Sequence, residues 1–298
     1  MEMDRRKATF IGIGAQKCAS TWLHGVLEQC GDVRVADGKE VDFFSYYFDR
    51  GYEWYERVFD AQPEVRHRGE VSPSYFIHPD APRRAAAYAS DLHVFVCLRD
   101  PVSRAFSNHL HEVRKGHVTG NNQVFETALE NNPLYIEQGR YAHHLARWRD
   151  AFPADRIHVF FQEEIYADRA AAARRVTDAL DLPALEDFLD RQVNESVRYR
   201  NAALGETLWK LGNIARQAGL GRAVETAKSV PGLRHLRAAN REGLRDVVPP
   251  MRPDTEKRIA DLLASEVDKL EHLLGHPVPW PRFRGPHAAL KDYRTDKI

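Results

Sequence analysis

Residues 8–22 read ATFIGIGAQKCASTW, and this stretch decides the class of fold that the sequence predicts. Its apolar first part, Ala8–Ile13, has the length of a buried strand and stops at Gly14. The segment Ser20–Gln29 then repeats apolar side chains at the spacing of an amphipathic helix. The opening unit is therefore predicted to be a strand, a glycine-containing turn and a helix.

The same alternation recurs further along the chain. His93–Leu98 (HVFVCL) is almost continuously apolar, which is typical of a strand covered on both faces. A helix is expected to follow it over Val102–Lys115, and a second pair is expected as the helix Tyr141–Phe152 and the strand Ile157–Phe161. Strands that alternate with helices predict an α/β fold, here a P-loop-like parallel sheet flanked by helices.

The strand signal ends near residue 195. Residues 203–247 are rich in Arg, Leu and Ala, and a last helix is expected over Asp254–Leu274 with Asp254 as its cap. The sequence therefore predicts a mainly helical C-terminal extension behind the sheet.

Composition limits the classes of function. The 298 residues carry 43 basic and 43 acidic side chains, so no net charge draws the chain to nucleic acid. Its three cysteines, Cys18, Cys30 and Cys97, lack the spacing of metal ligands, and no metal site or disulfide framework is predicted. No apolar run is long enough for a signal peptide or a membrane span, so a cytoplasmic protein without a transmembrane segment is expected.

The first turn has several features of an anion-binding site. A helix start offers unpaired N–H groups and a positive dipole end, Lys17 adds a point charge, and Ser20 and Thr21 add hydroxyl donors. The turn departs from a Walker A loop, because Lys17 has no glycine before it and no Ser or Thr directly after it. The alternative is an ordinary turn with Ser20 as helix cap and a solvated lysine.

Four blocks in order, the first being this turn, resemble the PAPS-dependent sulfotransferases (PAPS is 3′-phosphoadenosine-5′-phosphosulfate). Within that family, the chain looks like a bacterial member that is most similar to the heparan-sulfate-type, or Golgi carbohydrate, branch. The other blocks are KEVDFF at 39–44 with GYEWY at 51–55, CLRDPVSRAFS at 97–107, and GRY at 139–141 followed by Trp148, Phe152-Pro153 and Glu163-Glu164.

The resemblance implies PAPS as donor, PAP (adenosine 3′,5′-diphosphate) as product and no metal. It assigns the 3′-phosphate to Arg99 and Ser107, and a second contact with that phosphate to Arg198 and Arg200. Arg99 could instead pair with Asp100 or with a carboxylate at a helix end, and the two later arginines could be surface charge. The residues that it assigns to the 5′-phosphosulfate are Lys17, Cys18, Ala19, Ser20, Thr21 and Trp22.

Three residues are candidates for the chemistry. The resemblance places the general base at Glu40, and a carboxylate that takes the acceptor's proton suits that role. Lys17 is expected to stabilise the departing diphosphate, because transfer of this kind depends on positioning and cations. His111, with His109, is a reserve base. The alternatives are a solvated Glu40 beside Lys39 and histidines that only pack or face solvent.

One position departs from the heparan-sulfate-type pattern. Those enzymes carry a lysine that serves the active site and acceptor where this chain has Val71. The absence of this lysine weakens the case for a glycosaminoglycan acceptor. It does not affect the residues that the resemblance assigns to PAPS.

The sequence predicts transfer of a sulfuryl group to a hydroxyl or amine of a small molecule, glycolipid or saccharide. Residues 1–195 would form the PAPS-binding core, and 196–298 the helical part that contributes to acceptor and 3′-phosphate binding. The alternatives are a P-loop kinase or hydrolase, and a catalytically silent nucleotide-binding module. The basic stretch Lys210–Arg245 is either a solvated helix face or a contact with an anionic acceptor, a partner or a membrane surface. No oligomeric state is predicted.

Overall fold

The computed structural model describes residues 7–37, 40–59, 65–185 and 248–284, and the backbone of 197–199 and 241–243. The chain divides into two compact units. The sheet unit comprises residues 1–108, 132–193 and 253–298, and the second unit comprises residues 109–131 and 194–252.

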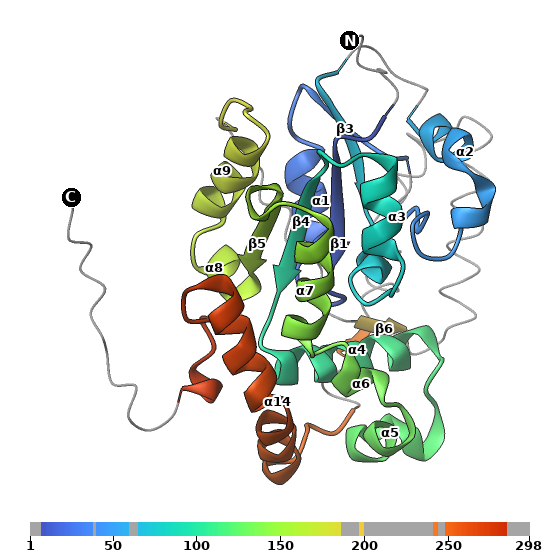
Figure 1. Ribbon diagram of the computed structural model, residues 1–298. Helices are drawn as coiled ribbons and strands as arrows, with labels where there is room; N and C mark the ends of the chain where they lie inside the picture. The colour runs from blue at the N-terminus through green and yellow to red at the C-terminus, as the bar shows by residue number, and fades with distance from the viewer. Residues whose placement is uncertain are drawn as a thin grey trace, which may run out of the picture. The chain divides into compact units, whose positions relative to one another are not determined.

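A five-stranded parallel sheet forms the centre of the sheet unit (Figure 1). Its strand order is β2-β3-β1-β4-β5, with β1 between β3 and β4. The chain fills one side of β1 with β2 and β3 and then crosses to β4 and β5, so the order reverses between β1 and β4. Ligands of open α/β sheets bind beyond the carboxyl ends of the strands at such a point. The strands are β1 (Phe10–Gly14), β2 (Val33–Val35), β3 (His67–Val71), β4 (His93–Leu98) and β5 (Ile157–Phe161).

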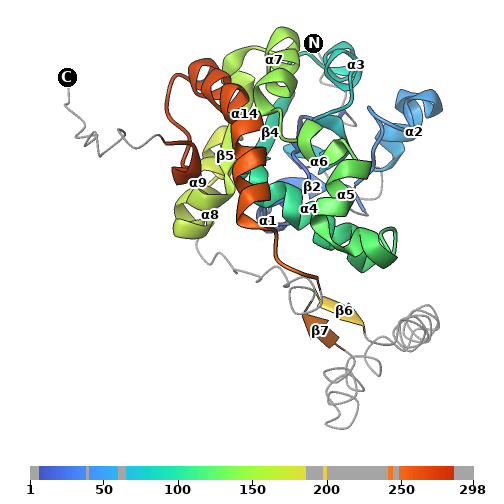
Figure 2. The same cartoon turned by 90° about the horizontal axis from the view of Figure 1, so that it is seen from below.

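Helices cover both faces of this sheet. Figures 1 and 2 show α1 (Ser20–Leu27) and α9 (Arg169–Ala179) on one face, and α3 (Ala81–Tyr88) and α7 (Tyr141–Ala151) on the other. The long helix α14 (Pro253–Leu274) packs against α7. The remaining helices of this unit are α2 (Tyr52–Arg57), α6 (Leu134–Glu137), α8 (Gln162–Ala167) and the first part of α4 (Pro101–Lys115).

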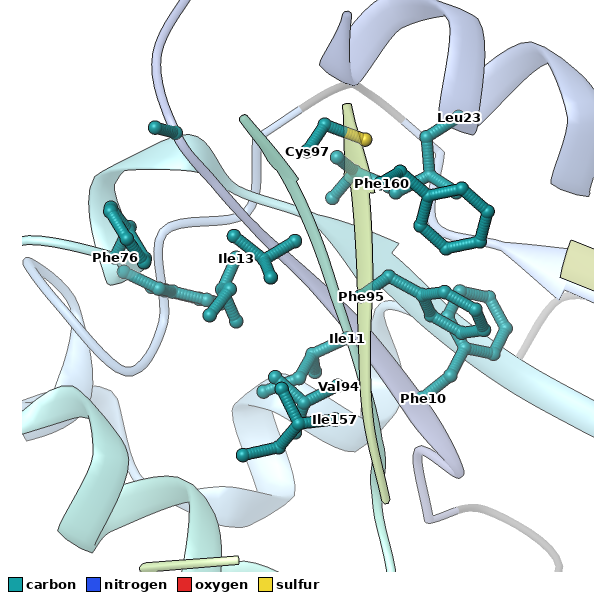
Figure 3. Close-up of a cluster of buried hydrophobic side chains, with 14 of the residues drawn as sticks. Phe10, Ile11, Ile13, Leu23, Phe76, Val94, Phe95, Cys97, Ile157 and Phe160 are labelled. Atoms are coloured by element: carbon teal, nitrogen blue, oxygen red, sulfur yellow. The ribbon is translucent and has the colours of Figure 1, made fainter. Parts of the chain in front are cut away.

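The core follows from the alternation of side chains along each strand. Figure 3 shows Phe10, Phe95 and Phe160 on the same side of the sheet as Leu23 of α1. Ile11, Val94 and Ile157 point to the opposite side, and all these side chains are buried. Each such burial stabilises the fold by about 1.5–3 kcal/mol, which explains why these strands read as continuous apolar runs.

The second unit is described in part. It holds the end of α4, α5 (Phe125–Asn131), and the antiparallel pair β6 (Val197–Tyr199) and β7 (Arg241–Gly243). Within it, the carboxylate of Glu126 accepts a hydrogen bond from the backbone N–H of Arg252 at 2.8 Å.

The predicted α/β class, its parallel sheet and the last helix, α14, are confirmed. The helical reading of 203–247 lies outside the described residues, apart from the backbone of 241–243. The expected strands at 8–13, 93–98 and 157–161 are β1, β4 and β5, and α1, α4, α7 and α14 lie where helices were expected. Three details are wrong: β2 and β3 were not predicted, two short strands occur beyond residue 195, and Asp254 lies inside the first turn of α14 because that helix begins at Pro253. The division at residue 195 stays a prediction.

Candidate active site

The loop that joins β1 to α1 is held against the neighbouring strand. The Ala15 N–H donates to the Cys97 carbonyl at 2.7 Å, which fastens the loop to the carboxyl end of β4. Gly14 has a φ of 124°, and a Cβ there would lie 2.8 Å from the Pro73 carbonyl oxygen. Lys17 and Ala19 also have positive φ, 66° and 68°. The loop therefore has a fixed, tightly wound backbone at the switch point of the sheet.

The start of α1 is open to an anion. Ala19 precedes the helix and no side chain caps it, and the first turn contains no acidic residue. The N–H groups of Trp22 and Leu23 donate to the Ala19 carbonyl at 3.0 and 3.1 Å. Earlier N–H groups of a helix have no intrahelical partner, so this end favours negative charge.

Cys18 links the loop to α7. Its thiol is fully buried, and burial raises its pKa to about 11, so it is a neutral thiol near pH 7. The sulfur lies 3.7 Å from the Tyr141 hydroxyl, which donates to the Arg99 carbonyl at 2.9 Å. Tyr141 therefore ties the loop to the residue that follows β4.

Arg99 lies at the carboxyl end of β4 and is half-buried. Its guanidinium and that of Arg104 both act electrostatically on Cys18, which places them near the loop. Within the described part of the chain, the Arg99 guanidinium forms no hydrogen bond and no ion pair. Asp100 pairs instead with Arg282, Oδ2 to Nε at 3.1 Å, so the alternative of an Arg99–Asp100 salt bridge is wrong.

Arg104 has a different environment. It is fully buried, and its guanidinium donates to the Gln138 side-chain oxygen at 3.0 Å and to the Tyr135 carbonyl. This arginine fastens α4 to the segment before α7, in keeping with a structural role.

The other nucleotide-site candidates differ in exposure. Lys17 is half-buried, Thr21 is exposed and Ser20 is buried. Ser107 is half-buried on α4, about two helical turns after Arg99. Trp22 is a buried core residue, and the centroids of the Trp22 and Phe160 rings lie 6.2 Å apart.

Glu40 is exposed on a turn with unusual backbone angles. Glu40 and Asp42 have φ values of 70° and 56°. The Asp42 N–H donates to Ser72 Oγ at 2.9 Å, and Ser74 Oγ donates to Asp42 Oδ1 at 2.5 Å. These bonds hold the turn to the segment that follows β3.

Beneath that turn lies a buried carboxyl group. Glu70 is 1% exposed, and its oxygens accept hydrogen bonds from the hydroxyls of Ser72 and Tyr75. Burial raises the pKa of Glu70 to about 7, and burial and the charge of Glu40 raise the pKa of Asp42. The Glu40 turn thus rests on a connected network of hydroxyls and carboxyls.

Val71 is buried beside this network and fills space over β1. A Cβ at Gly12 would lie 2.9 Å from the two Val71 methyl groups, so the two strands are in close contact here. No charge is offered at this position. Nearby aromatic residues differ in exposure: Phe43, Phe44 and Tyr55 are buried, whereas Tyr46 is 65% and Tyr47 41% exposed.

Several predicted residues belong to the second unit or lie outside the described residues. His111 belongs to the second unit, where its Nδ1 accepts a hydrogen bond from Arg114 at 3.0 Å. His109 in the same unit is buried and its Nε2 lies 2.8 Å from the Gln123 carbonyl. Arg198 is described only by its backbone, opposite Glu242, and Lys39 and Arg200 lie outside the described residues.

Among the residues that the structure describes, no three His, Cys, Asp or Glu side chains gather to hold a metal ion. In the same residues, no helix has the length and apolar character to cross a membrane.

Two residues of the site were not singled out by sequence reasoning. Tyr141 was noted only as part of a block, with no role. Arg282 had no signal at all, because it lies 182 positions from its partner Asp100.

A family model described as "Sulfotransferase domain" matches residues 7–200. Heparan sulfate glucosamine 3-O-sulfotransferase 3A1 of Mus musculus is 32% identical over 177 residues, which cover 57% of this chain and 44% of the relative. Heparan sulfate glucosamine 3-O-sulfotransferase 6 of the same species is 30% identical over 206 residues, covering 67% of this chain and 58% of the relative. The chain thus spans about half the length of the curated relatives it matches.

A solved sulfotransferase structure from Alicyclobacillus acidocaldarius has the same fold. It superimposes with a TM-score of 0.64 at 22% identity, over 91% of this chain and 97% of the other.

Proposed function

Because the chain belongs to the sulfotransferase domain family, we propose that it transfers a sulfuryl group from PAPS to a hydroxyl or amine of an acceptor, the reaction type EC 2.8.2. The observation that carries this proposal is the pairing of two features at the switch point of the sheet. One is the loop with its uncapped helix start, and the other is Arg99, whose guanidinium has no partner among the described residues.

Each feature suits one end of the nucleotide. The loop, with Lys17, Ser20 and Thr21, offers N–H groups, hydroxyls and a cation to the 5′-phosphosulfate. Arg99 offers a planar fork to the 3′-phosphate, with the Ser107 hydroxyl as a further donor. Arg198 and Arg200 are proposed as a second contact with the same phosphate. PAP would be the product that remains bound.

The transfer is an in-line displacement at sulfur. The acceptor oxygen or nitrogen forms a bond to sulfur while the bond from sulfur to the bridging phosphate oxygen breaks, and the bonding electrons stay on PAP. Lys17 stabilises the charge that develops on that leaving oxygen. The cations of the chain supply this stabilisation, so the proposal needs no metal.

Glu40 is proposed as the general base that takes the acceptor's proton. Its exposure leaves the carboxylate accessible to an incoming acceptor, and the bonds of Asp42 to Ser72 and Ser74 hold its turn in place. His111 and His109 remain the reserve candidates. The buried hydrogen bond of His109 to the Gln123 carbonyl favours a structural role for that residue.

The acceptor is proposed to be a small molecule, a glycolipid or a saccharide. The matched curated relatives are named for heparan sulfate. This chain has the buried Val71 where the resemblance to the heparan-sulfate-type branch implies a lysine. The exposed rings of Tyr46 and Tyr47 lie a few residues after Glu40 and are candidates for contact with the acceptor.

The proposal is tested by following the sulfuryl group. The protein is incubated with PAPS labelled in its sulfur and with a metabolite extract, and mass spectrometry identifies the compound that gains one SO₃ group. We expect PAPS to be consumed without magnesium, and ATP to be ignored. Consumption of ATP with magnesium, and no use of PAPS, would favour the P-loop kinase or hydrolase reading instead. Binding of PAP without any transfer would favour the catalytically silent module.

A further inference from the structure

The turn between β4 and α4 contains a carboxylate next to the proposed phosphate ligand. Asp100 directly follows Arg99, is 8% exposed and accepts the N–H of Ser103 on Oδ1 at 2.8 Å. Its carbonyl accepts the N–H of Arg104 at 2.8 Å, so Asp100 is the N-cap of α4. A buried carboxylate at this place would compete with a phosphate for the neighbouring guanidinium.

A residue from the far end of the chain neutralises that carboxylate. Arg282, in the short helical turn Pro281–Phe283, donates from Nε to Asp100 Oδ2 at 3.1 Å. Its Nη1 also pairs with Glu256 of α14, and its side chain is 26% exposed. The pair is thus largely shielded from water. Removing one partner of such a pair leaves a buried charge uncompensated, which is strongly destabilising.

The segment that carries Arg282 is fixed from a second side. Trp280 is fully buried and its ring N–H donates to Glu163 Oε2 at 3.1 Å. The other oxygen of Glu163 accepts the N–H of Asp100 at 2.9 Å. Arg282 and Glu163 therefore hold both the side chain and the backbone of Asp100.

We propose that Arg282 is a positioning residue for nucleotide binding, which pairs with Asp100 and so leaves the Arg99 guanidinium available for the 3′-phosphate. This inference rests on the proposed function. Arg104 cannot take over from Arg282, because its guanidinium is bound to Gln138 and Tyr135. Without Arg282, the Asp100 carboxylate is left buried and unpaired, and Arg99 is the adjacent cation that would turn to it.

The test compares two nucleotides that differ in the 3′-phosphate. Dissociation constants of PAP and of adenosine 5′-monophosphate are measured by calorimetry for the full chain and for four variants. In Arg282→Ala we expect PAP to bind about tenfold more weakly, because Arg99 turns to Asp100 and its charged hydrogen bond to the 3′-phosphate is lost. Binding of the monophosphate, which has no 3′-phosphate, should change little. In Arg282→Lys, which keeps the charge, most of the PAP affinity should remain.

The decisive variant combines Arg282→Ala with Asp100→Asn. Asparagine still caps α4 but carries no charge, so the ratio of the two affinities should return to that of the unaltered protein. Lys257→Ala is the matched control, since Lys257 pairs with Asp261 on the exposed face of α14 and should change neither constant.

Equal loss of both nucleotides in Arg282→Ala, or an unchanged PAP affinity, overturns the inference. If Arg282→Ala does not fold, the double variant decides alone: a retained ratio supports the inference and a lost ratio overturns it. If the unaltered protein itself shows no preference for PAP over the monophosphate, the proposed function fails, which is a separate outcome.

Discussion

The two ends of the central sheet use their basic side chains in opposite ways. At the carboxyl end, Arg99 has no partner among the described residues, and the nearby start of α1 has no cap. At the amino end, His93 Nδ1 lies 3.0 Å from His158 Nε2, and Arg156 donates to His93 Nε2 at 2.9 Å. One end leaves donors for a ligand, whereas at the other Arg156, His93 and His158 are paired with one another.

The histidines of the amino end are held neutral. Partial burial lowers the pKa of His93 to about 4, and it also lowers the pKa of His67 and of His158. The rings of His93 and His158 stack at 5.3 Å, and Thr9 Oγ1 lies 3.1 Å from His67 Nδ1. A cluster of basic side chains therefore indicates a ligand site only where its hydrogen-bond donors lack partners within the protein. Where they pair, the cluster contributes to stability.

The largest effect is expected at the carboxyl end. Glu40→Gln should lower the turnover number by roughly 10²–10⁴-fold, the usual cost of losing a general base, because an amide does not take up the acceptor's proton. The affinity for PAP should stay the same. Turnover is measured with the acceptor found by label transfer, and PAP affinity by calorimetry.

Glu53→Gln is the control for this variant, since Glu53 is 82% exposed in α2, where it pairs with Arg57. It should leave turnover unchanged. Unaltered turnover in Glu40→Gln would contradict the assignment and transfer the role of base to His111 or His109.

Next in size is the loss of nucleotide affinity. Lys17→Ala and Arg99→Ala should each weaken PAP binding by about 10–100-fold, the range for a lost charge-assisted hydrogen bond. Arg99→Ala should change the free energy of unfolding by no more than about 0.5 kcal/mol, because no described ion pair is broken. Calorimetry and urea unfolding measure the two quantities.

At the amino end, Arg156→Ala should have the opposite effect to Arg99→Ala. It should lower stability, because the bonds of Arg156 to His93 and to the Asp91 carbonyl are lost, and leave PAP affinity as it was. If PAP affinity is unchanged in both Lys17→Ala and Arg99→Ala, the contrast between the two ends fails.

The smallest effect is expected in acid. The folded-state pKa of His93 lies below its unfolded value of about 6.5, so the unfolded chain binds more protons between pH 6.5 and about 4. The stability that His93 contributes is complete above pH 6.5 and is lost as pH falls through this window. The free energy of unfolding should therefore fall less between pH 6.5 and about 4 in His93→Gln than in the unaltered protein. The expected difference is about 1–2 kcal/mol, which allows for the partial exposure of His93.

Urea unfolding at several pH values between 7.5 and 4.5 measures this difference. His117→Gln is the control for replacing a histidine by glutamine, because the His117 side chain is 61% exposed. An acid limb equally steep in His93→Gln and the unaltered protein would show that the amino end is not the pH-sensitive region.

The parts of the fold whose signals are local could be predicted from the amino-acid sequence. The apolar runs of β1, β4 and β5 and the glycine turn before Lys17 depend on neighbouring residues, so a periodic pattern identifies them. The position of Arg99 at the carboxyl end of the sheet is local in the same way, since Arg99 directly follows β4, whose sequence reads as buried.

The surroundings of those parts depend on tertiary packing. β3 (HRGEV) has little strand propensity, and it is a strand because it lies between β2 and β1. The partner of Asp100 is Arg282, and the hydroxyl that joins Cys18 to Arg99 belongs to Tyr141. Such pairings join positions from tens to nearly two hundred residues apart. Folding sets them when the sheet and its helices pack, so no spacing in the sequence records them.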